Sequence, residues 1–350
     1  MKKGLLRHCT VVFLSFAAFA TTQVSAQSVE EFYKAKNLTL IIASGVGGGY
    51  DVYGRVLARH IGKYIPGKPN VIVQNMDGAA GLRGINHLAN VAPRDGSVIQ
   101  ETYNNLTIQP LVSPRGTEYD PLTLRWIGST GTQLNICVTW HTSPIKTLDQ
   151  AKTREVTASA TGADGNPAIL PNILNRLIGT KFKIITGYNT AGSHLALERG
   201  EVESICGLAY STLLASQPAW FADKRLNFLT QFGLRKNPEL PDVPMVLDSI
   251  TDPKDRKVFD LLGVMQDMGR PYVAPPGIPE DRLAALRAAF DATVKDPDFL
   301  AESKKLLQEV NVMSGAEMER SIKAVYALPK EIIDRYAELI SNVQFQEKAK

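Results

Sequence analysis

The chain has 350 residues and a formal charge of +4, with 39 basic and 35 acidic residues. The small net charge and the absence of any basic run exclude a typical nucleic-acid-binding protein. The length is sufficient for two ordinary domains, each with its own core.

The N-terminus has the pattern of a signal peptide. Lys2, Lys3 and Arg7 precede a short apolar stretch at 11–20, and residues 1–26 contain no acidic residue. Val24-Ser25-Ala26 then fits the small-residue rule for cleavage. This stretch is too short to span a bilayer, and no later segment is long and apolar enough to do so. We therefore expect residues 1–26 to be removed near Ala26, leaving an exported and nearly neutral chain without stable membrane insertion.

Residues 38–103 alternate between short apolar segments and helical patterns. Strands are expected at 38–43, 71–75 and 98–103, and a helix at 52–64. Alternating β and α units predict a parallel sheet with right-handed crossovers and flanking helices. This predicts the α/β fold class.

A glycine-rich turn, residues 44–51, joins the first expected strand to the helix. Strand, glycine turn and helix start direct free backbone N–H groups and the positive end of the helix dipole at one point, which favours an anion. We expect Asp51 to cap the helix rather than to contact a ligand. A second glycine turn, 77–81, follows the second strand and opens on the same edge of the sheet, where α/β folds bind ligands.

The second half repeats this design. Residues 126–140 are expected to form one long strand that crosses into a second domain. Strands at 155–160 and 182–186 are each followed by a turn of small residues, a third strand is expected at 202–208, and residues 226–234 follow it. The last of these is a candidate return crossing.

Turns and helices dominate the chain beyond Pro238. A helix follows Pro279 and ends before Pro297, and a last helical region at 316–340 is expected to break at Pro329. We assign 27–125 and about 237–350 to a first lobe and 126–236 to a second, with crossovers near 126–140 and 226–236.

Only Cys137 and Cys206 remain after removal of the leader. They could pair in an oxidising compartment, but the sequence does not place them within bonding distance. We expect two separate buried thiols.

The sequence lacks the usual motifs of cofactor, metal and catalytic sites. Tyr50 and Val52 stand where the dinucleotide-binding pattern needs glycine, and no nucleotide-type phosphate loop occurs. The histidines are scattered without metal-ligand spacing, and no G-x-S-x-G elbow is present. We expect no cofactor, no metal and no catalytic residue, although a triad built from distant positions stays open.

Several motifs resemble those of one family. Gly47-Gly48-Gly49-Tyr50-Asp51 resembles its P-G-G-x-T-D segment, and residues 71–81 resemble V-V-V-E-N-R-P-G-A-G-G. Leu240-Pro241-Asp242-Val243-Pro244 matches L-P-D-V-P, and residues 274–279 resemble A-P-A-G-T-P. In order and spacing, the chain is similar to the substrate-binding proteins of tripartite tricarboxylate transporters, the TctC or Bug family.

The resemblance implies a two-lobed periplasmic receptor of the venus-flytrap type. Such a receptor captures a small organic acid between its lobes and delivers it to a membrane permease. The positions that match the family's ligand-binding turns are Gly47, Gly48, Gly49, Tyr50, Asp51, Asn75 and Ala79 in the first lobe, and Thr161, Gly162, Tyr188 and Asn189 in the second.

The sequence departs from the family at Tyr50, in the first glycine turn, and at Gly207. Tyr50 replaces a small hydroxyl residue, so it is expected to narrow the pocket or to stack on a flat acid. Gly207 stands where many members have aspartate. Two other functions stay open at this point: a periplasmic enzyme that acts on an organic acid, and a sensory module that presents its ligand to a signalling partner.

Overall fold

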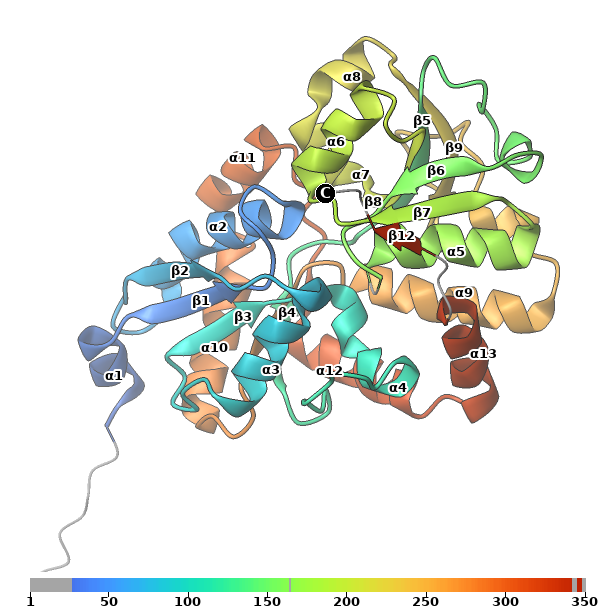
Figure 1. Ribbon diagram of the computed structural model, residues 1–350. Coiled ribbons are helices and arrows are strands. Elements are labelled where there is room, and N and C mark those ends of the chain that lie inside the picture. The colour runs from blue at the N-terminus through green and yellow to red at the C-terminus, as the bar shows by residue number, and fades with distance from the viewer. Residues whose placement is uncertain (1–26, 164, 342–344, 348–350) are drawn as a thin grey trace, which may run out of the picture.

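A computed structural model describes residues 27–163, 165–341 and 345–347, which form two six-stranded sheets flanked by helices (Figure 1). The expected α/β class with two lobes is confirmed, whereas the expected signal peptide lies outside the described residues. The sheet orders are β11-β4-β10-β3-β1-β2 and β12-β7-β6-β8-β5-β9. The strands are β1 (Leu38–Ile42), β2 (Val71–Asn75), β3 (Val98–Glu101), β4 (Arg125–Ser129), β5 (Asn135–Trp140), β6 (Val156–Ser159), β7 (Phe182–Thr186), β8 (Ser204–Ala209), β9 (Leu226–Phe232), β10 (Pro271–Ala274), β11 (Met313–Ser314) and β12 (Phe345–Glu347).

The helices cover both faces of each sheet. The α-helices are α1 (Val29–Ala35), α2 (Gly49–Ile61), α3 (Leu82–Asn90), α4 (Gln109–Val112), α5 (Asn166–Ile178), α6 (Thr190–Glu198), α7 (Tyr210–Ser216), α8 (Pro218–Ala222), α9 (Pro253–Asp267), α10 (Glu280–Thr293), α11 (Pro297–Lys305), α12 (Gly315–Tyr326) and α13 (Lys330–Ile340). The predicted break of the last helical region at Pro329 is confirmed, because Pro329 caps the start of α13. No helix in the described part of the chain is both long enough and apolar enough to cross a membrane.

Strand β1 lies at the centre of the first sheet's parallel part, between β2 and β3. Its residues are nearly all apolar because both faces of the strand are covered. Leu40 and Ile42 belong to the core beneath α2 and α10, while Ile41 belongs to the core beneath α3 and α12. This two-sided burial fixes the strand, and with it the position where the glycine turn leaves the sheet.

Residues 126–140 do not form the single long strand expected from sequence. They form two strands in different sheets: β4 pairs with β10 and β11, and β5 pairs with β8 and β9. Residues 130–134 between them carry the chain from one lobe to the other. The change of sheet coincides with the glycine and polar residues 128–133, a turn signal that the expectation of one strand overlooked.

The C-terminal region is divided between the two lobes. The expectation that all of about 237–350 belongs to the first lobe is therefore wrong for part of this region. Strand β12 pairs with β7 of the second sheet, and α9 and α13 lie beside that sheet in Figure 1. Phe259 of α9 and Tyr336 of α13 are buried in the core that contains Phe182 of β7. Amphipathic helices show that they need a core to cover, but not which of two cores they cover.

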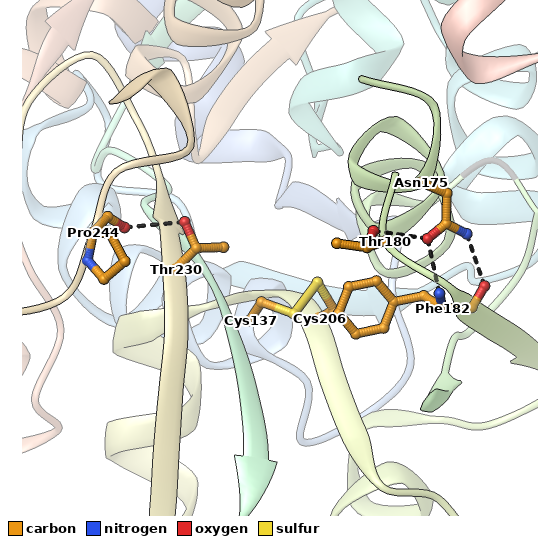
Figure 2. Close-up of a disulfide and its surroundings, with 7 residues drawn as sticks. All are labelled: Cys137, Asn175, Thr180, Phe182, Cys206, Thr230 and Pro244. Carbon is orange, nitrogen blue, oxygen red and sulfur yellow. Dashed lines mark hydrogen bonds between the residues drawn. A yellow bond between two sulfur atoms is a disulfide. The ribbon is translucent and has the colours of Figure 1, made fainter. Parts of the chain in front are cut away.

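Cys137 and Cys206 form a disulfide, so the expectation of two separate thiols is wrong (Figure 2). They face one another on neighbouring antiparallel strands, β5 and β8. The bond lies within the second lobe's core, near Phe182. At a sequence separation of 69, only strand register brings the two residues together.

Candidate functional site

A cavity of about 480 Å³ lies where turns from the two lobes meet. Its size is within the usual range of small-molecule pockets. Of the residues expected to bind a ligand, those that line it are Gly47, Gly48, Gly49, Tyr50, Ala79, Thr161, Tyr188 and Asn189. Asp51, Asn75 and Gly162 do not line it.

Four helices of nine or more residues begin at the cavity wall. The wall includes Gly49 of α2, Gly81 at the start of α3, Asn166 of α5 and Thr190 of α6. The first N–H groups of a helix have no acceptor within it, and the dipole places partial positive charge there. Helix starts from both lobes therefore make the cavity attractive to an anion.

The first glycine turn exposes its donors because its cap has no side chain. Gly48 is the N-cap of α2 and provides no side-chain hydrogen bond. Gly49, Tyr50 and Asp51 are the first three residues of α2, so their backbone N–H groups have no acceptor within the helix. Gly47 has a φ of +80°, a conformation that favours glycine. The turn thus holds the start of α2, with its free N–H groups, in a fixed arrangement.

Asp51 holds this turn from behind rather than from inside the cavity. Its carboxylate accepts hydrogen bonds from the Gly47 N–H (2.9 Å), Arg55 Nε (2.9 Å) and Asn75 Nδ2 (2.7 Å). Asn75 Nδ2 also donates to the Ser44 carbonyl oxygen at 2.8 Å. Burial acts to raise the pKa of Asp51, but these hydrogen bonds together hold it below its usual value. Asp51 and Asn75 therefore position the turn.

The second glycine turn has an unusual backbone. Gly78, Ala79, Ala80 and Gly81 all have positive φ, and two of them are alanines. Alanine rarely adopts this conformation, and such backbone strain is concentrated at ligand sites. All four residues line the cavity.

Tyr50 does not present a free ring to the cavity. Its side chain is buried, and its hydroxyl donates to Gln133 Oε1 at 2.7 Å. The Tyr103 ring lies 4.4 Å away, and the Arg270 guanidinium carbon lies 4.4 Å from the Tyr50 ring centroid. The ring thus narrows the cavity floor and supports Arg270, and its neighbours leave little room for stacking on a ligand.

Arg270 is the main residue that sequence reasoning missed. It directly precedes β10, lines the cavity and is only 1% exposed. Its Nη2 donates to Thr212 Oγ1 of α7 at 3.1 Å, which joins the first lobe's side of the cavity to the second. A lone arginine after a helix carries no motif, so no sequence signal could have found it.

The chain returns to the first lobe between α9 and β10, not near 226–236 as expected, because β9 and α9 both pack in the second lobe. This return segment is hydrogen-bonded to residues 129–133 of the first crossing beneath the cavity. The Arg270 N–H donates to Ser129 Oγ at 3.0 Å, and the Thr130 N–H donates to the Arg270 carbonyl oxygen at 3.2 Å. The Gln133 N–H donates to the Gln266 carbonyl oxygen at 2.8 Å. Arg270 and Gln133 therefore belong to the floor that joins the lobes.

The residues that the structure describes on the second lobe's side of the cavity are neutral. Asn189 caps α6 by accepting a hydrogen bond from the Gly192 N–H at 2.7 Å. Gly207 has a φ of +87°, and a Cβ built there would overlap the Asn166 carbonyl oxygen. The start of α5 thus occupies the space that an aspartate at 207 would need.

Among the described residues that line the cavity, only Asp77 and Arg270 carry a formal charge. Asp77 is exposed, whereas Arg270 is buried. No group of three or more histidine, cysteine, aspartate or glutamate residues suited to a metal ion is found in the described residues. The site therefore offers a buried cation and backbone donors.

Two α/β lobes that enclose such a cavity define the class of two-lobed solute-binding receptors. The model of tripartite tricarboxylate transporter family receptors, TctC, matches residues 54–337. The chain therefore belongs to this family, as its motifs predicted, and is a receptor rather than an enzyme.

Relatives match along almost their whole length. A Cupriavidus necator protein, described as a UPF0065 protein in the gbd 5' region, is 23% identical over 329 residues, covering 91% of this chain and 93% of the relative. An R. palustris structure with adipate has a TM-score of 0.68 at 14% identity, covering 89% of this chain and 99% of that chain. MatC from Rhodopseudomonas palustris with bound malate has a TM-score of 0.66 at 16% identity, covering 87% and 99%. At these identities the structures show a shared fold.

Proposed function

We propose that the protein is a periplasmic receptor that binds a small organic acid in the interlobe cavity and delivers it to a tripartite tricarboxylate-type membrane transporter. The observation that carries the proposal is the meeting of four helix N-termini at one cavity. A carboxylate accepts several hydrogen bonds at once, and bonds to charged groups contribute about 1.5–3 kcal/mol each. The bound adipate and malate of two structural relatives are acids of this kind.

The proposed contacts are divided between the lobes. The turn at Gly47–Gly49 and the start of α2 hold the carboxylate, and Ala79 borders it in the second glycine turn. Thr161, Tyr188 and Asn189 approach it from the second lobe, and hinge closure buries it. The ligand must bind the closed state better than the open state to drive this closure.

The location and the partner also belong to the proposal. Residues 1–26 act as the export signal, with cleavage near Ala26, and the mature receptor meets its permease outside the cytoplasm. Deleting the gene should abolish uptake of the labelled acid, and restoring the full chain should recover it. Unchanged uptake in the deletion strain would contradict a role in delivery.

A thermal-shift screen tests ligand capture. Residues 27–350 are heated with adipate, malate, succinate, citrate and benzoate, and with the neutral diol of each diacid as a control. An acid at 100 times its Kd stabilises the protein by about 2.7 kcal/mol, which shifts Tm by several degrees. No shift with any acid across a broad panel would refute the proposal.

A further inference from the structure

Arg270 is a buried cation without an anionic partner. Its side chain is 1% exposed, and it forms no ion pair in the described part of the chain. Its Nε has no hydrogen-bond partner there, and its Nη2 donates to the neutral Thr212 hydroxyl. A guanidinium has five N–H donors. Most of this group's donor capacity is therefore unused in the protein itself.

The neighbours of Arg270 do not neutralise it. Its guanidinium carbon lies 4.4 and 4.6 Å from the ring centroids of Tyr50 and Tyr53, where cation–π attraction offsets part of the cost of burial. The nearby carboxyl group of Glu101 is fully buried. Burial raises the pKa of Glu101 well above its usual range, although Arg270 opposes the rise. No ion pair joins Glu101 to Arg270 in the described residues.

Two sources of positive potential converge on one part of the cavity floor. A Cβ built at Gly49, the first residue of α2, would lie 3.3 Å from Arg270 Nη2. The guanidinium is therefore next to the backbone donors at the start of this helix. A carboxylate at this point would meet both a full charge and a helix dipole.

We propose that Arg270 pairs directly with the carboxylate of the ligand at the floor of the cavity and thereby selects an acid over its neutral analogue. This inference rests on the proposed function. A buried charge without a partner is unfavourable, and a ligand carboxylate would supply the opposite charge. Backbone N–H groups at the start of α2 would donate hydrogen bonds to the remaining lone pairs of the carboxylate. Because Arg270 is also hydrogen-bonded to Thr212 of the second lobe, the pair forms where the lobes meet.

The test compares Arg270→Gln with Arg270→Lys. The tightest-binding acid among adipate, malate, succinate, citrate and benzoate is titrated into the wild-type protein and both variants. We expect affinity to fall roughly 30- to 1000-fold in R270Q, because one partner of a buried charge pair is lost. R270K keeps the charge without the planar fork, so it should recover part of this loss.

Arg287→Gln serves as the matched control. Arg287 is also partly buried and hydrogen-bonded, to the Trp126 carbonyl oxygen, but it does not line the cavity. Its substitution should leave affinity unchanged. The primary amide of the same acid should bind wild-type protein far more weakly, and R270Q should largely remove this preference for the acid.

The outcomes separate the two proposals. If no acid binds the wild-type protein, the proposed function and this inference both fail. If R270Q binds the acid as tightly as the wild type, only the inference is overturned. If R270Q does not fold, a crystal structure of the wild-type complex decides: a carboxylate oxygen within hydrogen-bond distance of the guanidinium supports the pair, and a carboxylate held elsewhere overturns it.

Discussion

The two sides of the cleft are stabilised in different ways. On the first lobe, the buried Asp51 carboxylate, Arg55 and Asn75 fix the glycine turn through charge-assisted hydrogen bonds. On the second lobe, the neutral Asn189 caps α6, and a disulfide ties β5 to β8 within the core. The two formal charges found among the described lining residues, Asp77 and Arg270, belong to the first lobe or to the segment leading into its β10 strand.

This difference indicates a division of labour between the lobes. The first lobe presents rigid donors and a buried cation before a ligand arrives, so little reorganisation is needed on binding. The second lobe brings helix starts and neutral side chains to the other side of the ligand. Changes in the first lobe should therefore alter affinity, whereas changes in the second lobe's core should alter stability.

Removing the disulfide should give the largest effect, and one confined to stability. The bond closes a loop across 69 positions, for which the chain-entropy relation gives about 4 kcal/mol. We expect the double variant Cys137→Ala, Cys206→Ala to lose this amount in urea unfolding and to keep its affinity for an acid where it is folded. An unchanged unfolding midpoint would argue against the covalent link between β5 and β8.

Gly49→Val should damage binding more than stability. The new side chain would overlap Thr212 Oγ1 and press on Arg270, which would hold the lobes apart. Overpacking of this kind corresponds to roughly a 10- to 100-fold loss of affinity, measurable by calorimetric titration. Gly162→Ala is the control, because a Cβ there meets nothing within 4 Å and Gly162 does not line the cavity. Equal losses in both variants would show that the interlobe contact at Gly49 does not matter.

Asp51, which holds the first glycine turn, and Asn189, which caps α6, can be compared directly. Asp51→Asn removes charge-assisted hydrogen bonds and should cost about 1.5–3 kcal/mol, with weaker binding as the glycine turn loosens. Asn189→Ala removes a neutral cap and should cost only about 1 kcal/mol. Urea unfolding and acid titration of both variants would test this order, and a larger loss for N189A would reverse the comparison.

The effect of Asp51 should also depend on pH. Its pKa is lower in the folded state than its usual value, so its contribution is present above the unfolded-state pKa and is lost as pH falls through the folded-state pKa. In D51N this part of the acid dependence should disappear, so the difference from wild type should shrink below about pH 4. A constant difference down to the lowest accessible pH would contradict the assignment.

Asp77→Asn should give the smallest effect. Asp77 is the one acidic side chain among the lining residues that the structure describes, and it is exposed to solvent. Removing its charge should tighten binding of a dianion such as malate by roughly two- to fivefold, because exposed charge interactions are weak. The gain should vanish at 1 M salt through screening. A gain that persists at high salt would indicate a structural cause.

The sequence predicted the overall design because that design depends on local pattern. Short apolar segments predicted buried parallel strands, and β2 and β7 begin and end where they were expected. Glycine turns after these strands line one cavity, because the carboxyl ends of parallel strands share an edge. The family followed from motifs that keep their order along the chain.

Only the tertiary structure decided which distant residues meet. Strand register joined Cys137 to Cys206, and core packing placed α9 and α13 beside the second sheet. The same packing put Asp51 and Asn75 behind the first glycine turn and brought Arg270 to the cavity floor. A residue's identity and neighbours in the chain carry its local preferences, but burial and long-range contact arise only when two lobes fold against each other.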